Sequence, residues 1–303
     1  MRALTADKDA SWRDALMCRN VARGARRTIE CMRKPLHWIL AAACLLAALP
    51  GRGEIAAGPP EMAAAYRAQV DRALDVPAPE ARRYVQLAQA AFARAEIAVT
   101  AAQYVAVVDR DPYVQVIFIY FIAAVDGEWQ LIGASPVSTG RPGAFDHFET
   151  PIGVFEHSLA NPDFRAEGTL NENGIRGYGA KGMRVFDLGW QLVPKGWGDG
   201  ARIEMRLQMH ATDADLLERR LGSAQSKGCI RIPASLNKLL DRYGLLDADY
   251  FAALEQGREL WVLDAHREPA AWPGRWVVVV DSQRTDRPEW SPGPFIPHVR
   301  PKR

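Results

Sequence analysis

Two runs, Met209-His210-Ala211-Thr212 and Ser226-Lys227-Gly228-Cys229-Ile230-Arg231, decide which fold and chemistry this sequence predicts. A cysteine attacks a carbonyl group as the thiolate, so it needs a nearby base and positive or dipolar surroundings. His210, 19 positions before Cys229, is the candidate base. Gly228 lets the backbone approach a reacting carbonyl closely, and Arg231 offers a fixed cation for a carboxylate. An arbitrary cysteine and histidine more often pack in a core, so the case rests on the surrounding pattern.

These runs resemble the signature of the L,D-transpeptidase (YkuD-type) catalytic domain. In that family a histidine and a small residue are followed, after an intervening segment, by Ser/Thr-His-Gly-Cys, a hydrophobic residue and Arg or Asn. Here 15 residues lie between His210 and Ser226. The matching positions in the second run are Ser226, Gly228, Cys229, Ile230 and Arg231. Two positions depart: Lys227 replaces the usual second histidine, and Ala211 replaces the usual glycine or serine.

Two turn-rich runs upstream strengthen the resemblance. Pro136-Val137-Ser138-Thr139-Gly140 is similar to the family's strand that ends in Ser-Thr-Gly. Thr150-Pro151-Ile152-Gly153-Val154-Phe155 is similar to its Thr-Pro-x-Gly-x-Phe element. Each pattern is weak alone, but both stand in the family's order ahead of the cysteine. We therefore expect residues 103–264 to form a catalytic domain with the mainly β, sandwich-like fold and small helices that the resemblance implies.

The resemblance implies acyl transfer on peptidoglycan stem peptides. Cys229 is then the nucleophile that attacks the L,D-amide before a terminal D-Ala, and His210 removes and returns the proton. The carbonyl of Ala211 is expected to orient the imidazole, and the N–H groups of Gly228 and Cys229 to stabilise the oxyanion. Within the same motif, Ser226 is a further site residue, while Arg231 and Lys227 are expected to bind substrate, with Lys227 also favouring the thiolate. No metal or organic cofactor is implied.

Other acceptors and one other class of protein stay open. Water as the acceptor gives an L,D-carboxypeptidase, and a lysine of an outer-membrane lipoprotein gives a protein-to-peptidoglycan linking enzyme. A papain-like or NlpC/P60 peptidase places its cysteine before its histidine, which is the reverse of the order here. Lys227 keeps a non-catalytic peptidoglycan-binding module as the alternative outside enzymes.

Residues 1–57 read as a leader and an export signal. The arginine-rich start precedes Met32, which is the expected start codon because Met-Arg-Lys directly adjoins an apolar run at residues 35–49. That run is short for a membrane span, so we expect a secretory signal, with an uncleaved N-terminal anchor as the alternative. Either one predicts a place in the periplasm or cell envelope. Exported protein would then keep one cysteine and no disulfide framework. The net charge of +2 among 303 residues is no nucleic-acid footprint.

The remaining segments are predicted from periodicity. Residues 58–102 are expected to form a helical arm with helices at 61–74 and 79–97, acting as packing or spacer. Strands are expected at 104–108, 113–121, 129–132 and 203–209, the last ending at His210, with a turn at Asp126-Gly127. Helices are expected at 216–221 and from Pro233 to the stop at Gly244, and a closing strand at 259–263.

The glycine-rich segment 158–200 has no clear period, so we expect a flap bordering the substrate groove. Trp190 and Trp197 either line that groove or pack beneath it. His147 and His157 are expected to be solvated loop residues, since no spacing completes a metal site. The segment 265–303 is expected to add a strand at 276–280 and a proline-rich, irregular tail from Arg284.

Overall fold

The computed structural model describes residues 57–123, 127–291 and 293–294. The predicted start at Met32, the signal segment and Asp126 of the predicted turn lie outside the described residues, as does the end of the tail. Within the described residues, no helix combines the length and apolar character needed to cross a membrane. All the described residues belong to one compact unit.

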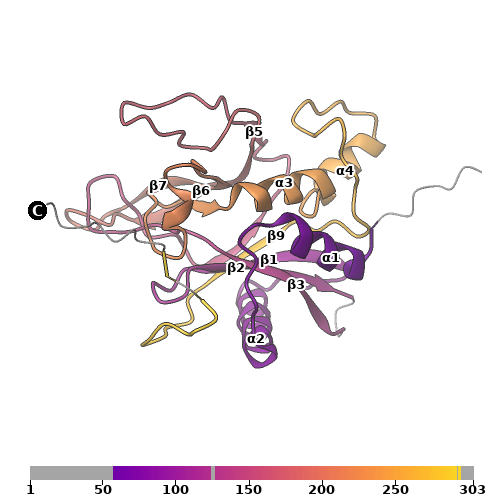
Figure 1. Ribbon diagram of the computed structural model, residues 1–303, viewed down its shortest axis with the longest axis horizontal. Helices are drawn as coiled ribbons and strands as arrows, with labels where there is room; N and C mark the ends of the chain where they lie inside the picture. The colour runs from indigo at the N-terminus through magenta and orange to yellow at the C-terminus, as the bar shows by residue number, and fades with distance from the viewer. Residues whose placement is uncertain (1–56, 124–126, 292, 295–303) are drawn as a thin grey trace, which may run out of the picture. The chain divides into compact units, whose positions relative to one another are not determined.

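Two β-sheets and four α-helices make up this unit, as the predicted mainly β fold with a preceding helical arm requires (Figure 1). The first sheet has the strand order β3-β2-β1-β9-β4 and the second β5-β6-β7-β8. The strands are β1 (Gln103–Asp109), β2 (Val116–Ile122), β3 (Trp129–Pro136), β4 (Gly153–Glu156), β5 (Phe164–Arg165), β6 (Arg184–Pro194), β7 (Arg202–Ala211), β8 (Ile230–Ile232) and β9 (Trp276–Val280). The helices are α1 (Pro59–Gln69), α2 (Ala78–Arg94), α3 (Ala234–Tyr243) and α4 (Ala248–Glu255).

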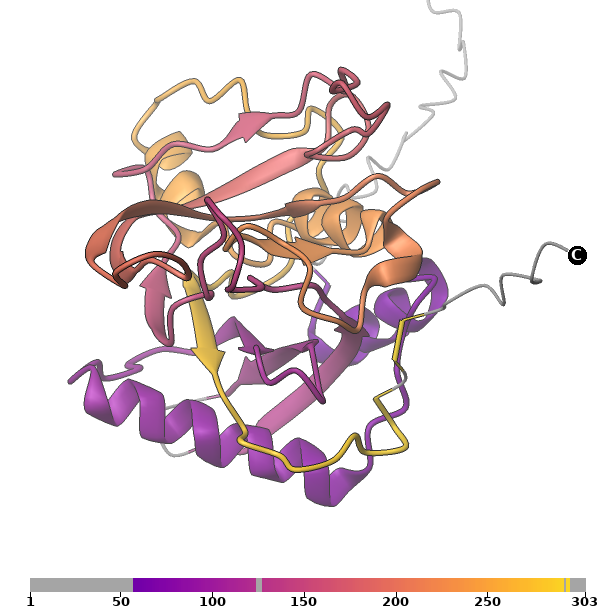
Figure 2. The same cartoon turned by 90° about the vertical axis from the view of Figure 1, so that its left-hand side faces the viewer.

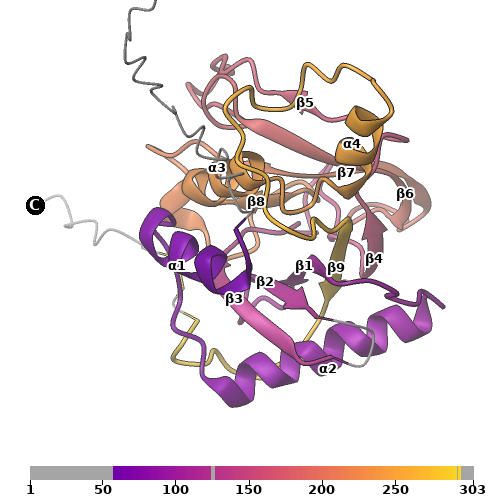
Figure 3. The same cartoon turned by 90° about the vertical axis from the view of Figure 1, so that its right-hand side faces the viewer.

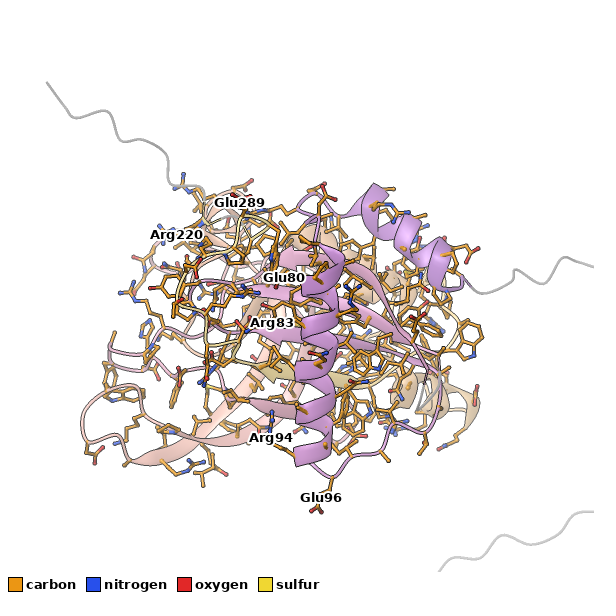
Figure 4. All side chains as sticks on the ribbon, turned by 90° about the horizontal axis from the view of Figure 1, so that it is seen from below. Glu80, Arg83, Arg94, Glu96, Arg220 and Glu289 are labelled. Atoms are coloured by element: carbon orange, nitrogen blue, oxygen red, sulfur yellow. The ribbon has the colours of Figure 1, made fainter. Side chains whose placement is uncertain are left out.

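The first sheet is covered on both faces, which explains why β2 is apolar throughout. Ile117 and Ile119 belong to the core shared with the second sheet, while Phe118 and Tyr120 pack in a separate core with α2. Figure 4 shows α2, seen from below, lying across the strands with Arg83 and Arg94 at its surface. Successive residues of a strand point to opposite faces, so a strand between two apolar layers loses its alternation.

The two N-terminal helices pack against the first sheet. Pro59 and Pro60 open α1, where a missing backbone N–H has no cost. The Tyr66 hydroxyl of α1 meets the Ser135 hydroxyl of β3 at 2.6 Å. Gly133 of β3 is needed beneath that ring, because an added Cβ would lie 2.2 Å from Tyr66 Cδ1. Compared with the predicted helix at 61–74, α1 both starts and ends earlier, at Pro59 and Gln69.

β9 lies inside the first sheet. It pairs in parallel with β1 and antiparallel with β4 (Figure 3). After it, the chain follows α2, where Arg83 donates to the Ser282 carbonyl and Arg284 forms an ion pair with Glu80 (Figure 2). The predicted domain boundary at residue 264 would therefore separate β9 from the other strands of its own sheet.

Three local predictions were wrong. The segment 158–200 contains β6, whose alternation is interrupted by a register shift between Asp187 and Trp190 at a glycine with positive φ, Gly189. The expected helix at 216–221 is only a 3₁₀ turn at Glu218–Arg220. Residues 259–263 form no strand, and the apolar residues before them form α4 instead.

The predicted helix that stops at Gly244 is confirmed as α3, with Gly244 in the left-handed conformation.

His157 is buried, which corrects its interpretation as a solvated loop residue. Its imidazole meets Asp163 at 2.9 Å, and the guanidinium of Arg184 joins Asp163 to Asp247 at 2.6 and 2.7 Å. Burial alone would lower the pKa of His157. The carboxylates of Asp163 and Asp247 outweigh that effect and raise the pKa. This buried ionic cluster connects β6 to the start of α4, and paired charges of this kind are costly to disrupt one at a time.

Candidate active site

The register of β7 and β8 brings His210 and Cys229 to one face of the second sheet. The two strands are parallel, with Met209 opposite Ile230 and His210 opposite Arg231. Cys229 directly precedes β8, so it falls beside Gln208, two residues before His210 and on the same face. The other face of β7 carries Met205, Leu207 and Met209 into the core. The predicted strand leading to His210 is confirmed.

The orientation of the His210 ring follows from one hydrogen bond. Nδ1 lies 2.6 Å from the carbonyl oxygen of Ala211, which can only accept, so Nδ1 carries the proton and Nε2 has a free lone pair. The role expected of Ala211 is thus matched by a contact. Burial lowers the pKa of His210 to about 4, and the nearby cation of Arg231 acts in the same direction. The imidazole is therefore a neutral base at neutral pH.

The Cys229 thiol is half-buried and un-ionised at rest. Sγ lies 3.8 Å from the carbonyl oxygen of Arg206, to which the thiol donates. Burial raises the pKa of Cys229, while a backbone hydrogen bond from Gln208 and the charge of Arg231 partly oppose that effect. Proton transfer to a base is consequently required before the sulfur can attack, because the thiolate is the nucleophile.

The loop that presents Cys229 is held by the two upstream runs. Thr150 Oγ1 donates to the carbonyl of Gly228 at 2.7 Å and accepts from the N–H of Gly140 at 2.8 Å. Ser138 exchanges backbone hydrogen bonds with Arg231. Gly140 has no room for a side chain, since a Cβ there would lie 2.0 Å from the Phe148 carbonyl oxygen. The runs that looked like weak β patterns thus fix the loop that carries Cys229.

The N–H of Gly228, for which an oxyanion role is expected, already has a hydrogen-bond partner. Its N–H donates to Ser226 Oγ at 3.1 Å, and that hydroxyl donates to the carbonyl of Cys229 at 2.6 Å. Ser226 therefore closes the turn around Gly228, which has a φ of 132° that favours glycine. The Ser226 hydroxyl would have to release this N–H before it could bind an oxyanion, so the oxyanion role of Gly228 stays a prediction.

Lys227 and Arg231 lie in different environments. The Lys227 ammonium is exposed and pairs with Asp146 at 2.7 Å. Arg231 is half-buried, its Nε has no hydrogen-bond partner among the described residues, and no ion pair links it to a described carboxylate. Arg231 is thus the cation available to a bound carboxylate, whereas the thiolate-favouring role expected of Lys227 stays a prediction.

A polar network that sequence reasoning missed surrounds the pair. The Tyr178 ring packs edge-on against His210 at 4.6 Å between centroids, and its hydroxyl donates to Gln208 at 3.0 Å. Gln208 donates to the buried Asp187 at 2.9 Å, and Arg206 forms an ion pair with Asp187 at 2.7 Å. Gln208 and Arg206 stand two and four residues before His210, so the two-residue period of a strand could have identified them.

Part of the glycine-rich segment 158–200 forms a pocket beside this network. It has a volume of about 490 Å³ and is lined by residues between Phe164 and Tyr178, with Gly179 at its end. Tyr178 is shared between the pocket and the surroundings of His210, while Cys229 does not line it. Trp190 is exposed on the site face, whereas Trp197 packs edge-on against Phe148 at 5.0 Å. Among the described residues, no group of three or more His, Cys, Asp or Glu side chains is placed to hold a metal.

Comparisons with known proteins add little to this geometry. No model of a protein family matches the chain, and no curated protein matches it. A solved structure of a fused Zn-dependent amidase/peptidase/peptidoglycan-binding domain-containing protein from Clostridium acetobutylicum is similar with 13% identity and a TM-score of 0.25. The similarity covers 68% of this chain and 64% of that one, so the chain spans less than two thirds of that protein.

Proposed function

We propose that this protein is a cysteine acyltransferase of the L,D-transpeptidase type that acts on peptidoglycan stem peptides. The observation that carries the proposal is the placement of Cys229 and His210 on one face of adjacent strands, with Nε2 of the imidazole free to accept a proton. The sequence pattern that contains these two residues names the reaction class. The signal-like segment before the described residues supports action in the cell envelope.

The proposed reaction begins from a neutral pair. Nε2 of His210 takes the thiol proton as Sγ of Cys229 bonds to the carbonyl carbon of the L,D-amide. The tetrahedral adduct collapses to a thioester, and the same proton goes to the nitrogen of the departing D-Ala. An amine of a second stem then loses a proton to His210 and attacks the thioester, which restores the thiol. Arg231 is the cation suited to the carboxylate of the departing residue.

The test is incubation with stem tetrapeptide muropeptides, followed by mass analysis of protein and products. We expect a covalent acyl-enzyme and release of D-Ala, both abolished in Cys229→Ala. That substitution removes one sulfur from a half-buried position, so thermal unfolding should stay close to the parent. A cross-linked dimer, a tripeptide or a protein-linked product would identify an amine, water or a protein lysine as the acceptor.

A carbapenem provides a second substrate-independent readout, because its strained carbonyl acylates reactive cysteines. A carbapenem adduct that persists on Cys229→Ala would place the nucleophile elsewhere and refute the proposal. Failure of the folded parent protein to react with either reagent would favour a binding module instead.

A further inference from the structure

Tyr178, in the glycine-rich segment 158–200, packs against the imidazole of His210. The two rings meet edge-on, with 4.6 Å between their centroids. The Tyr178 side chain is 40% exposed, whereas His210 is only 4% exposed. A partly exposed ring that packs on a buried one shields it from water. The position of Tyr178 therefore controls how far the imidazole of His210 is desolvated.

The Tyr178 ring is fixed at its hydroxyl end by Gln208 of β7. The hydroxyl meets Gln208 Oε1 at 3.0 Å, and no other described residue forms a hydrogen bond with that hydroxyl. Gln208 is buried, so an amide oxygen that lost this donor would be left unpaired at a cost. The Phe164 ring also lies edge-on to Tyr178 at 5.5 Å, but an apolar contact has no fixed direction. The hydrogen bond is thus the contact that sets the direction of the ring.

Asp187 determines which end of the Gln208 amide faces Tyr178. The buried Asp187 carboxylate forms an ion pair with Arg206 and accepts a hydrogen bond from Gln208 Nε2 at 2.9 Å. An ionised carboxylate can only accept, so the amide nitrogen must point toward it and the amide oxygen toward Tyr178. The Tyr178 hydroxyl then has to be the donor. The order of donors and acceptors from Asp187 to Tyr178 has no alternative.

Two further contacts hold the backbone around Tyr178 rather than its ring. The N–H of Arg176 donates to the buried carboxylate of Asp213 at 2.9 Å. Gly179 packs directly on Ala211, since an added Cβ would lie 2.9 Å from the Ala211 Cβ. Both contacts belong to the main chain of the segment. Loss of the hydroxyl bond would therefore release the Tyr178 ring while the segment stays attached.

We propose that Gln208 is a positioning residue that holds the Tyr178 ring against His210 and so keeps the base out of water. This inference rests on the proposed function for the role of His210 as the base. The contact itself and its effect on the imidazole are measurable whatever the reaction is.

Several charged and titratable groups surround the imidazole, and their identities decide what a change at Gln208 can alter. They are Arg231 and Cys229 at β8, Tyr178 and Arg176 in the glycine-rich segment, Asp213 after β7, and Asp187 and Arg206 beyond Gln208. Arg231 disfavours the imidazolium form, and its charge stays when Gln208 or Tyr178 is replaced. Asp187 also keeps its ion pair with Arg206. Burial of the ring is thus the quantity that Gln208 controls.

The test is a pH titration of His210 by NMR, in protein whose histidines carry ¹³C, with His210→Gln identifying the signal. The parent is compared with Tyr178→Phe, Gln208→Met and the double variant. Tyr178→Phe keeps the ring and removes its hydroxyl, whereas Gln208→Met keeps a side chain of similar length and removes the acceptor. Tyr113→Phe is the matched control, because it removes a hydroxyl from a ring that is 43% exposed. Circular dichroism verifies that each protein is folded.

We expect the pKa of His210 to stay at about 4 in the parent and in Tyr113→Phe. Each single variant at Tyr178 or Gln208 should raise it by about one pH unit or more, a part of the shift of about 3–5 units that full burial can cause. The double variant should match the single ones, because both remove the same hydrogen bond. A parent-like titration in folded Tyr178→Phe and Gln208→Met, or shifts that add in the double variant, would overturn the assignment of Gln208.

The rate constant for acylation by a carbapenem, measured on the same proteins, connects the contact to the reaction. A protonated imidazole cannot take the thiol proton, so the rate should begin to fall at a higher pH in both single variants than in the parent. A raised pKa of His210 with an unchanged acid limb would overturn the positioning role. A parent that is acylated at no pH would refute the proposed function, while the NMR titration would still test whether Gln208 holds Tyr178 against His210.

Discussion

The buried imidazole of His210 sets the pH dependence expected of the site. Its pKa is lowered to about 4, so it remains a neutral base well below the usual titration range of a histidine near pH 6.5. We expect the rate constant for acylation by a carbapenem to stay level as the pH falls through about 6.5, and to decline only toward about 4. Single-turnover mass spectrometry across this range would measure it.

Stability has to be followed in the same experiment. As the pH falls from about 6.5 toward 4, the unfolded chain gains a proton at His210 and the folded chain does not, so this residue favours unfolding increasingly in that window. His157 acts with the opposite sign, because its raised pKa stabilises the folded protein where it is protonated. A rate that falls near pH 6.5 while circular dichroism shows the protein folded would contradict a neutral, buried His210.

Single residues also show where sequence reasoning stopped. Cys229, His210 and the orienting carbonyl of Ala211 follow from one motif, and the structure places them together. Lys227 is two positions from Cys229 in sequence but turns outward to Asp146, because the chain turns between them at Gly228, which has a φ of 132°. Tyr178 comes from a distant flap without a periodic pattern, so nothing local pointed to it.

At the level of elements, β7 was predictable and β6 was not. The alternation from Ile203 to Met209 is regular because one face meets the core and the other meets the site. β6 carries the buried polar Asp187 and shifts register at Gly189, so its pattern is interrupted where the network is built. The apolar run before residue 259 forms α4, since short apolar runs suit either structure and their tertiary contacts decide.

The Thr150 side chain links the loop that carries Cys229 to the chain segment after β3. Its hydroxyl joins the N–H of Gly140 to the carbonyl of Gly228, and all three groups are buried. Thr150→Val keeps the shape but leaves both backbone groups unpaired, so we expect a loss of about 1–3 kcal/mol in the free energy of unfolding. Urea denaturation would measure that loss.

Thr150→Val should also displace the loop that carries Cys229. We expect Thr150→Val to be acylated more slowly by a carbapenem at Cys229, even where the protein is fully folded, because small misplacements of reacting groups reduce rates strongly. Thr169→Val, which removes an exposed hydroxyl from the flap, is the control and should change neither quantity. Unchanged acylation in folded Thr150→Val would show that the loop holds its position without this link.

The whole molecule depends on segments outside the 103–264 range that the motifs indicate. β9 supplies the strand between β1 and β4, and α2 covers the outer face of the first sheet through Tyr84 and Phe92. Neither segment has a motif, and pairing between strands so far apart in sequence leaves no local pattern. Whether the sheet is stable without these two segments is therefore open to direct measurement.

We expect a chain of residues 58–294 to unfold cooperatively, and chains of residues 58–264 and 103–294 to fail to do so. Loss of β9 leaves the ladders of β1 and β4 unpaired inside the sheet, and buried backbone groups without partners are costly. Loss of α1 and α2 exposes Phe118 and Tyr120 to water, at about 25 cal/mol for each Å² of apolar surface. Thermal unfolding followed by circular dichroism distinguishes the three chains. A sharp transition in either shortened chain would instead show that the segment it lacks is an addition to a sheet that is stable without it.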